Sequence, residues 1–498
     1  MESIASEIEA LRNTGYHGEN TETGRLNNRD EDRREIGKDK EKGTVLLFVS
    51  IVAVNLLAFT TGCHMVWTSP TIPHLKSNDT LINPLGDSPA TVSDISLIAG
   101  IYFFGSVAGC LVPAKVLDNY GRKSILALMA ALMSVASIVL AFAGSVWLYC
   151  ICRLILGMGK GTTLMLVPIY TGEVAHKGNR GRFAFFMPTL LAMGLVYSYI
   201  TGPHFSTRVY TLLCTVPILL ALVLILLVVP ETPYFLVAQN RPRHEVAEVL
   251  GKLRSSDDLV EELKQIEGAV VGKYTSGKSS YRSLFRDRAS RKAFMISTAA
   301  ITFHLLSGVS IIHSFLGPIL DKVTAAFLSG NTSAIAISLV KLFSTATGSM
   351  AVERCGRKPL FIWSAIFVAM SHYTLGLYFQ LQELEYDFVF LLAPLPFICF
   401  VLFALVYSFG MGPVPFAYLS EFFPQHTKNV GVPICTAIGA LLNAFITLVF
   451  PYFMEYLGMQ WVFWLFAVSC TCCAIFTKYV IPETKGKTLE EIQRMLEE

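Results

Sequence analysis

The sequence D-N-Y-G-R-K at 118–123 returns much later in the chain as E-R-C-G-R-K at 353–358. Each copy follows a long apolar run and combines a glycine with two basic residues. A glycine allows the chain to reverse tightly, and the basic residues then lie at the end of the following apolar segment. The pattern is typical of a short turn at a membrane surface that occurs twice in one protein.

Two further charged motifs repeat in the same order. The first is an acid followed seven residues later by a basic residue, as Glu173 with Arg180 and again as Glu421 with Lys428. The second is P-E-T, at 230–232 and again at 482–484. Three repeated signatures among apolar runs indicate a duplicated membrane unit. A duplicated six-helix unit is typical of proteins that move a solute across a membrane. Solute transport is therefore the leading functional hypothesis.

The composition agrees with a membrane protein. The 498 residues are 53% hydrophobic and only 15% charged, whereas soluble domains carry roughly 25% charged residues. Twelve apolar stretches are long enough to cross a bilayer, from 44–67 to 459–478, and the tenth (388–420) is predicted to bend at Gly412-Pro413. The predicted fold class is an all-α membrane protein with twelve transmembrane helices in two homologous six-helix halves.

The apolar runs also give a domain organisation. We expect a cytosolic N-terminal tail at 1–43, a first six-helix half at 44–229, a cytosolic linker at 230–292, a second half at 293–479 and a cytosolic C-terminal tail at 480–498. Within the linker, apolar residues at helical spacing predict two short amphipathic helices. The first helix contains Val246, Leu250 and Leu253, and the second contains Leu259, Leu263, Ile266 and Val270.

The basic residues predict the orientation in the membrane. If both termini are cytosolic, only Lys76, Arg208 and Lys322 of the 40 Lys and Arg residues lie in outside loops. The glycosylation sequons at Asn78 and Asn331 also fall in loops that this topology places outside. We therefore expect a multi-pass glycoprotein of the plasma membrane.

Each basic turn has an acidic partner within reach. Arg122 is predicted to pair with Glu173, and Arg357 with Glu421, at the cytosolic ends of helices. We predict that these pairs gate the transporter, together with the other repeated charged residues Asp118, Arg180, Glu353, Lys428 and Glu483. The alternative is that the basic residues only anchor the loops on the cytosolic side.

Several further motifs resemble one family. They include R-L-I-L-G-M-G at 153–159, P-E-T-P-Y-F-L at 230–236, G-R-K-P-L at 356–360 and P-E-T-K-G-K-T-L-E-E-I at 482–492. The chain resembles the sugar porter family of the major facilitator superfamily, close to the insect facilitated trehalose transporter-like proteins. The resemblance implies the major facilitator fold, a central solute site and alternating access. It also implies trehalose or a hexose as substrate and facilitative transport.

The positions that bind hexose in this family are mostly changed. Counted from the family motifs, which include Ser307-Gly308, these positions are His304, Ser310, Phe416 and Asn443. Of these four, only Asn443 carries the family's usual residue. The corresponding position of the fifth span is Pro188. A sugar is held by many hydrogen bonds of about 1 kcal/mol each, so such losses matter.

Basic residues have been added inside the spans. Lys160 and Lys341 are unusual in the family, and a lysine in the middle of a span costs about 2.5–3.5 kcal/mol. They predict an electropositive cavity that favours an anionic or strongly polar small solute. The alternative is that both lysines extend to an interface or bond to backbone carbonyls. The coupling candidates are Arg153, which the family shares, and His64. His64 lies in Gly62-Cys63-His64, where proton-coupled relatives carry an aspartate after a glycine and an aromatic residue.

The remaining alternative is a non-transporting sensor on the same fold. The sequence shows no spacing typical of an enzyme, a metal site or a cofactor site, and none for nucleic acid or an obligate protein partner. The expected partners are therefore the lipid bilayer and a small-molecule solute.

Overall fold

The computed structural model describes residues 44–176, 178–254, 259–275, 281–323, 329–487 and 489–497. The first half is built from one group of helices: α3 (Val45–Val66), α4 (Thr68–Leu75), α5 (Val92–Tyr120), α6 (Arg122–Ala141), α7 (Val146–Val174), α8 (Arg180–Ala184), α9 (Phe186–Thr201), η1 (Gly202–His204) and α10 (Thr207–Leu227).

The second half repeats this arrangement. Its helices are α15 (Arg288–Leu306), α16 (Val309–Asp321), α17 (Gly330–Cys355), α18 (Arg357–Glu383), η2 (Asp387–Leu392), α19 (Leu395–Phe409), α20 (Val414–Glu421), α21 (Gln425–Tyr452), η3 (Phe453–Leu457), α22 (Met459–Val480) and α23 (Leu489–Glu497).

In the part of the chain that the structure describes, 11 helical segments are long and apolar enough to cross a membrane. The helix α17 lies at the place of the predicted eighth span, outside that set, and its 26 residues are long enough to cross. With α17 the architecture is the predicted one, twelve transmembrane helices in two six-helix halves.

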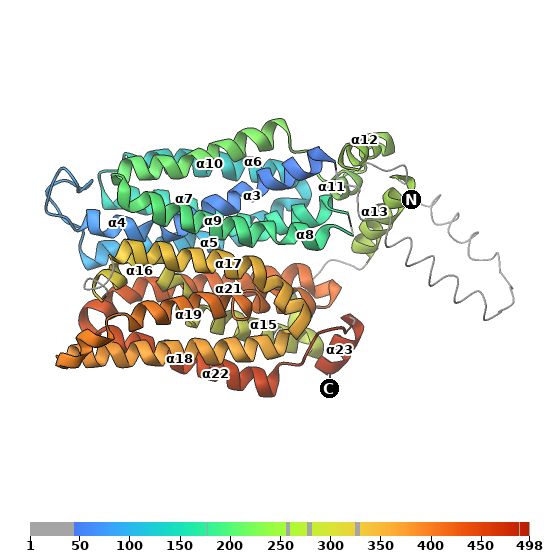
Figure 1. The fold of residues 1–498 in the computed structure, drawn as a ribbon. Helices are drawn as coiled ribbons and strands as arrows, with labels where there is room; N and C mark the ends of the chain where they lie inside the picture. The colour runs from blue at the N-terminus through green and yellow to red at the C-terminus, as the bar shows by residue number, and fades with distance from the viewer. Residues whose placement is uncertain are drawn as a thin grey trace, which may run out of the picture.

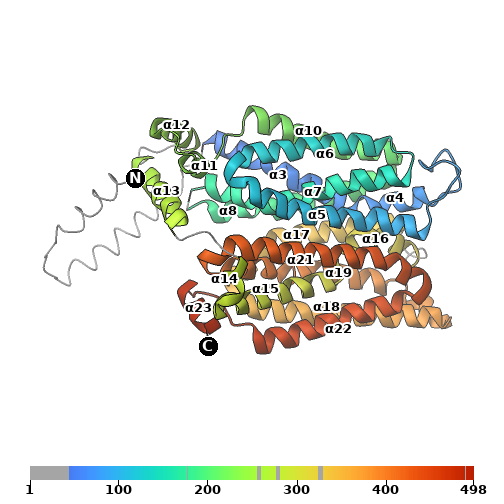
Figure 2. The ribbon, with the colours of Figure 1, turned by 180° about the vertical axis from the view of Figure 1, so that it is seen from behind.

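The two halves lie side by side, with α5 and α9 of the first half against α21 and α17 of the second (Figures 1 and 2). The linker helices and α23 gather at one end of the bundle, which we call the linker side. The α4 and α16 helices approach the opposite end, which we call the far side. The start of α3 also lies on the linker side, since the Thr44 hydroxyl donates to the carbonyl of Lys252 at 2.7 Å.

The linker contains the two predicted amphipathic helices. They are α12 (Arg243–Leu253) and α13 (Leu259–Thr275), and two shorter helices flank them, α11 (Pro233–Ala238) and α14 (Tyr281–Arg286). Leu250, Ile266 and Val270 form a small buried cluster of their own. Arg254 fastens this unit to the first half, because its guanidinium donates to the carbonyl of Val174 at 2.7 Å and pairs with Glu262.

Two spans are broken. The predicted bend at Gly412-Pro413 is confirmed, because it separates α19 from α20. The seventh span is also interrupted, between α15 and α16, which the apolar pattern does not predict. There Gly308 has φ +77, a left-handed conformation that favours glycine.

Glycines bring α5 and α7 into close contact. A Cβ atom on Gly157 would lie 1.9 Å from the carbonyl oxygen of Tyr102, and one on Gly105 would lie 2.0 Å from that of Leu154. Gly109 and Gly161 approach the opposite helix in the same way, so each helix carries a G-x-x-x-G pair at the contact. The two backbones therefore touch, and any side chain at these positions would separate them.

Candidate functional site

The repeated motifs meet on the linker side of the first half. Arg122 begins α6, and its guanidinium donates to the Glu173 carboxylate at 2.8 Å, while the Thr232 hydroxyl donates to the other Glu173 oxygen at 2.6 Å. Glu231 accepts the backbone N–H groups of Arg122 and Lys123 and so caps α6. Burial raises the pKa of Glu231, and these hydrogen bonds together with the charge of Arg122 oppose that rise.

The second half contains the same arrangement. Arg357 pairs with Glu421 at 3.0 Å, and Glu483 accepts the backbone N–H groups of Arg357 and Lys358. Gly356 precedes this helix at φ +92, as Gly121 does at φ +84 in the first half. The repeated P-E-T and G-R-K motifs are therefore two parts of one structural unit.

The basic residue that follows each acid also has the same role in both halves. Arg180 donates to the carbonyl of Gly172 at 2.6 Å, and Lys428 donates to that of Ser420 at 2.8 Å. Both carbonyls belong to the residue directly before the acid of the ion pair. These contacts satisfy carbonyls in the last turns of α7 and α20.

Both predicted ion pairs are present, and each joins helices of a single half. Asp118 lies 3.9 Å from Arg122, and the side chain of Glu353 lies outside the described residues. Because neither pair crosses between the halves, separation of the halves does not require either pair to break. Their part in gating stays a prediction.

The hydrogen bonds that join the two halves lie on the far side. Among the described residues, the hydrogen bonds that join the halves connect the Thr68 hydroxyl to the Ser314 carbonyl, the Gly317 N–H to Ser69, the Tyr199 hydroxyl to the His313 carbonyl, and the Ser96 hydroxyl to the Leu448 carbonyl. The far side of the bundle is thus held closed.

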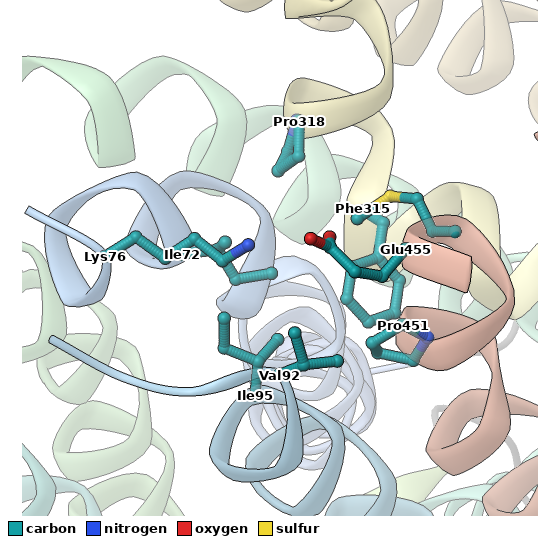
Figure 3. Close-up of a pocket in the computed structure, with 9 residues that line it drawn as sticks. Ile72, Lys76, Val92, Ile95, Phe315, Pro318, Pro451 and Glu455 are labelled. Atoms are coloured by element: carbon teal, nitrogen blue, oxygen red, sulfur yellow. The ribbon is translucent and has the colours of Figure 1, made fainter. Parts of the chain in front are cut away.

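A small pocket marks the outer edge of this closed seam (Figure 3). Ile72 and Lys76 come from the α4 region of the first half, and Phe315, Pro451 and Glu455 come from the second. The Lys76 ammonium and the Glu455 carboxylate point toward one another across the pocket. Opposite charges therefore face each other where the halves would separate.

His304 lies at the centre of an aromatic cluster in the second half. Its Nδ1 lies 2.8 Å from the carbonyl oxygen of Met411, so Nδ1 carries the proton and donates it. The Tyr407 hydroxyl lies 3.0 Å from Nδ1 and 3.3 Å from Nε2, and in this tautomer Nε2 is the ring nitrogen that can accept from it. The ring edge also packs on Phe416, with centroids 5.3 Å apart.

Of the other predicted binding positions, Ser307 and Ser310 lie close to His304 along the chain. The Ser307 hydroxyl donates to the His304 carbonyl at 2.6 Å, and the Ser307 carbonyl accepts from His372 at 2.9 Å. Ser310 is buried on α16. Asn443 is buried on α21, where its amide oxygen accepts from Thr447 of the same helix at 3.5 Å.

The charged residues of the first half contact aromatic rings. Arg153 is fully buried, donates to the His64 carbonyl at 2.6 Å and lies 4.2 Å from the centre of the Tyr102 ring. The Lys160 ammonium lies 3.9 Å from the centre of the Phe103 ring. Lys160 thus lies within the bundle against aromatic rings and does not extend to an interface, and its role in solute binding stays a prediction.

His64 is also fully buried. Its Nε2 lies 3.5 Å from the Ser137 hydroxyl, between α3 and α6. Its role and that of Arg153 in coupling stay predictions.

The sequence alone does not single out Tyr407, Tyr199 or Tyr102. Aromatic residues make up 12% of the chain, so a tyrosine in an apolar run carries no signal of its own. The close packing of α5 and α7, in contrast, has a sequence signal in the two G-x-x-x-G pairs.

The comparisons with known proteins agree with this geometry. A family model described as "Sugar (and other) transporter" matches residues 33–496. The chain belongs to the sugar (and other) transporter family. It is therefore a multi-pass membrane transporter, and the family is one of transporters rather than of enzymes.

Its relatives include sugar carriers of animals. The chain is 28% identical over 465 residues to the mouse solute carrier family 2, facilitated glucose transporter member 8, covering 90% of this chain and 93% of that one. It is 26% identical over 495 residues to the facilitated trehalose transporter Tret1 of Bombyx mori, covering 98% and 95%.

Solved structures show the same fold. The inward open conformation of the xylose transporter XylE from E. coli has a TM-score of 0.74 at 21% identity, and covers 90% of this chain and 99% of that one. XylE bound to 6-bromo-6-deoxy-D-glucose has a TM-score of 0.71 at 23% identity. This sugar transporter family member thus has the major facilitator fold.

Proposed function

We propose that this sugar transporter family member carries trehalose or a hexose across the plasma membrane by facilitated alternating access. The observation that carries the proposal is that a polar and aromatic cluster around His304 lies inside a two-halved bundle whose halves are hydrogen-bonded on the far side. The relatives named as glucose and trehalose transporters support the choice of solute.

The mechanism follows from which contacts join the halves. The far-side hydrogen bonds, such as that between Tyr199 and His313, must break when the transporter opens outward. The linker-side clusters lie within single halves and keep their helices together during that movement. Rocking of two rigid halves then exposes the central cluster to each side in turn.

Uptake of radiolabelled glucose and trehalose into oocytes expressing the chain tests the proposal. Saturable uptake that a protonophore leaves unchanged supports a facilitative sugar carrier. If the protein is verified at the surface and moves neither sugar, the proposal fails and a sensor on the same fold becomes the better explanation.

Asn78 provides a test of the orientation. It is exposed in the loop between α4 and α5, on the far side, whereas the other sequon, Asn331, lies in the first turn of α17. We expect the variant Asn78→Gln to run at a lower apparent mass on gels and to lose the mobility shift caused by a glycosidase. A glycan that persists in this variant, and is lost in Asn331→Gln, would show that only the second sequon is used. If neither site carries a glycan, the sequons no longer support the orientation in which the far side of the bundle faces the outside of the cell.

His304 provides a test of the central cluster. The variant His304→Ala removes the partner of Tyr407 and the packing surface of Phe416, so both rings lose their positions. We expect sugar uptake per surface molecule to fall by about tenfold, because one net hydrogen bond and one ring contact together are worth about 1.4 kcal/mol. The matched control is His244→Ala, an exposed linker histidine, which should leave uptake unchanged. Normal uptake by His304→Ala would place the solute elsewhere.

A further inference from the structure

A basic pair lies inside the second half, at its contact with the first. The Lys341 ammonium of α17 forms a hydrogen bond with Nε2 of His313 on α16. Both residues line a small cavity together with Tyr199 of the first half and Phe403 of α19. The volume open to water there is about 20 Å³, enough for a water molecule and too small for a whole sugar in this conformation.

Two further basic groups converge on this pair. His304 and His313 both lie near enough to Lys341, and to Lys160 of the opposite half, to interact with them electrostatically. Lys341 also contacts the Tyr407 ring, whose hydroxyl bonds to His304. Through Tyr407 and His304, this basic group joins the aromatic cluster of His304, Tyr407 and Phe416 described above.

Among the described residues, Lys160 and Lys341 have no acidic partner. In the part of the chain that the structure describes, no carboxylate lies within ion-pair distance of Lys160 or Lys341. The groups that act electrostatically on His304 and His313 are basic throughout. The charges of Lys341 and of Lys160, from opposite halves, both act on these histidines within the apolar bundle, where an anion would offset the cost of burying the charges.

Hydrogen-bonding groups stand beside the charges. Ser310 lies on the same side of α16 as His313 and Ser314, one turn earlier. The hydroxyls of both serines and Nδ1 of His313 are buried and have no hydrogen-bond partner among the residues that the structure describes. Buried polar groups of this kind are normally satisfied, so these three atoms can bond a polar ligand or a water molecule.

We propose that the preferred substrate of this chain is a sugar acid, a sugar that carries one carboxylate. The carboxylate would bind the Lys341–His313 pair, with the positive charge of Lys160 on the opposite half acting at longer range, and Ser310 and Ser314 would bind sugar hydroxyls. The proposal rests on the proposed function, since it names the substrate class of the same central site. A single anionic group on a polyol matches a site that contains both ammonium groups and unpaired hydroxyls.

Competition against labelled glucose uptake in oocytes tests the substrate class. Unlabelled glucuronate, glucose 6-phosphate and glucose are compared as inhibitors, and labelled glucuronate uptake is measured directly. In Lys341→Met we expect the ratio of glucuronate to glucose uptake to fall by about tenfold to a hundredfold, because a hydrogen bond to a charged group is lost. The ratio does not depend on how much protein folds, and Lys341→Arg should restore most of it. The matched control is Lys478→Met, which removes an exposed lysine at the linker-side end of α22.

The outcomes separate this proposal from the sugar-transport proposal. Saturable glucuronate uptake that depends on Lys341 supports both. Glucose uptake that glucuronate does not inhibit would overturn the sugar-acid assignment and leave sugar transport intact. Inhibition by glucose 6-phosphate alone would equally overturn the carboxylate assignment. Uptake of neither glucose nor glucuronate by protein verified at the surface would overturn both proposals.

Discussion

Replacement of Glu173 by alanine is expected to destabilise the transporter by about 3–5 kcal/mol. The side chain of Arg122 is 6% exposed, and its charged partner within hydrogen-bond distance is Glu173, at 2.8 Å. Asp118 lies further away, at 3.9 Å. The variant Glu173→Ala therefore leaves a buried guanidinium without its hydrogen-bonded counter-charge, and it also removes the acceptor for the Thr232 hydroxyl. The melting temperature of the detergent-solubilised protein, measured by size-exclusion chromatography after heating, reports the loss.

The double variant Arg122→Met with Glu173→Ala tests whether the instability comes from the unpaired buried charge or from the loss of the ion pair itself. It removes the stranded charge as well as the ion pair, so its melting temperature should recover part of the loss seen in Glu173→Ala. The corresponding pair of the second half is more exposed, 24% for Arg357 and 21% for Glu421, and Glu421→Ala should be milder. Glu248→Ala, on the exposed surface of α12, is the neutral control. A double variant less stable than Glu173→Ala would contradict the argument.

Replacement of Gly157 by valine is expected to prevent assembly of the first half. The Cβ atom alone would lie 1.9 Å from the Tyr102 carbonyl oxygen and 2.8 Å from its carbon. Both atoms belong to the backbone of α5, so no side chain can move aside. The helices must separate by more than 1 Å, at a cost at the upper end of the roughly 1–3 kcal/mol usual for overpacking. We expect the variant to lose the monodisperse chromatography peak and sugar uptake together.

The control for Gly157 is a glycine without neighbours. Gly268 lies in α13, and a Cβ atom there would meet nothing within 4 Å. Gly268→Ala should leave uptake unchanged and raise stability by about 0.5–1 kcal/mol, since alanine favours a helix. A variant Gly157→Val with wild-type melting temperature and uptake would show that α5 and α7 are further apart than the structure places them.

Local rules explain why so much of the fold was predictable. The spans are long apolar runs, and any such run must satisfy its backbone hydrogen bonds within itself in lipid, so it forms a helix. The linker helices follow from apolar residues at helical spacing, and Leu250 and Ile266 are buried as that spacing predicts. The bend at Gly412-Pro413 follows from proline, which cannot donate to the helix.

Other features depended on contacts between segments far apart in the sequence. The break at Gly308 has no proline beside it, and the left-handed conformation there is visible only in the fold. The P-E-T and G-R-K motifs are recognisable as repeats, but the capping of α6 by Glu231 requires that a loop after α10 return to the start of α6. The position of Lys160 against Phe103 depends on the close approach of α5 and α7.

For the candidate site too, the sequence determined some features and the tertiary structure determined others. The sequence determined by itself that this chain is a duplicated twelve-span membrane protein, because apolar length and repeated charges are local properties. The sequence also identified His304, Phe416 and Lys341 as residues within spans that are unusual for the family. Only the tertiary structure decided that His304 joins Tyr407 and Phe416, and that Lys341 meets His313 where the halves touch. The physical reason is that an apolar span is compatible with many rotations about its own axis, and the rotation that places a side chain is set by packing against the neighbouring helices.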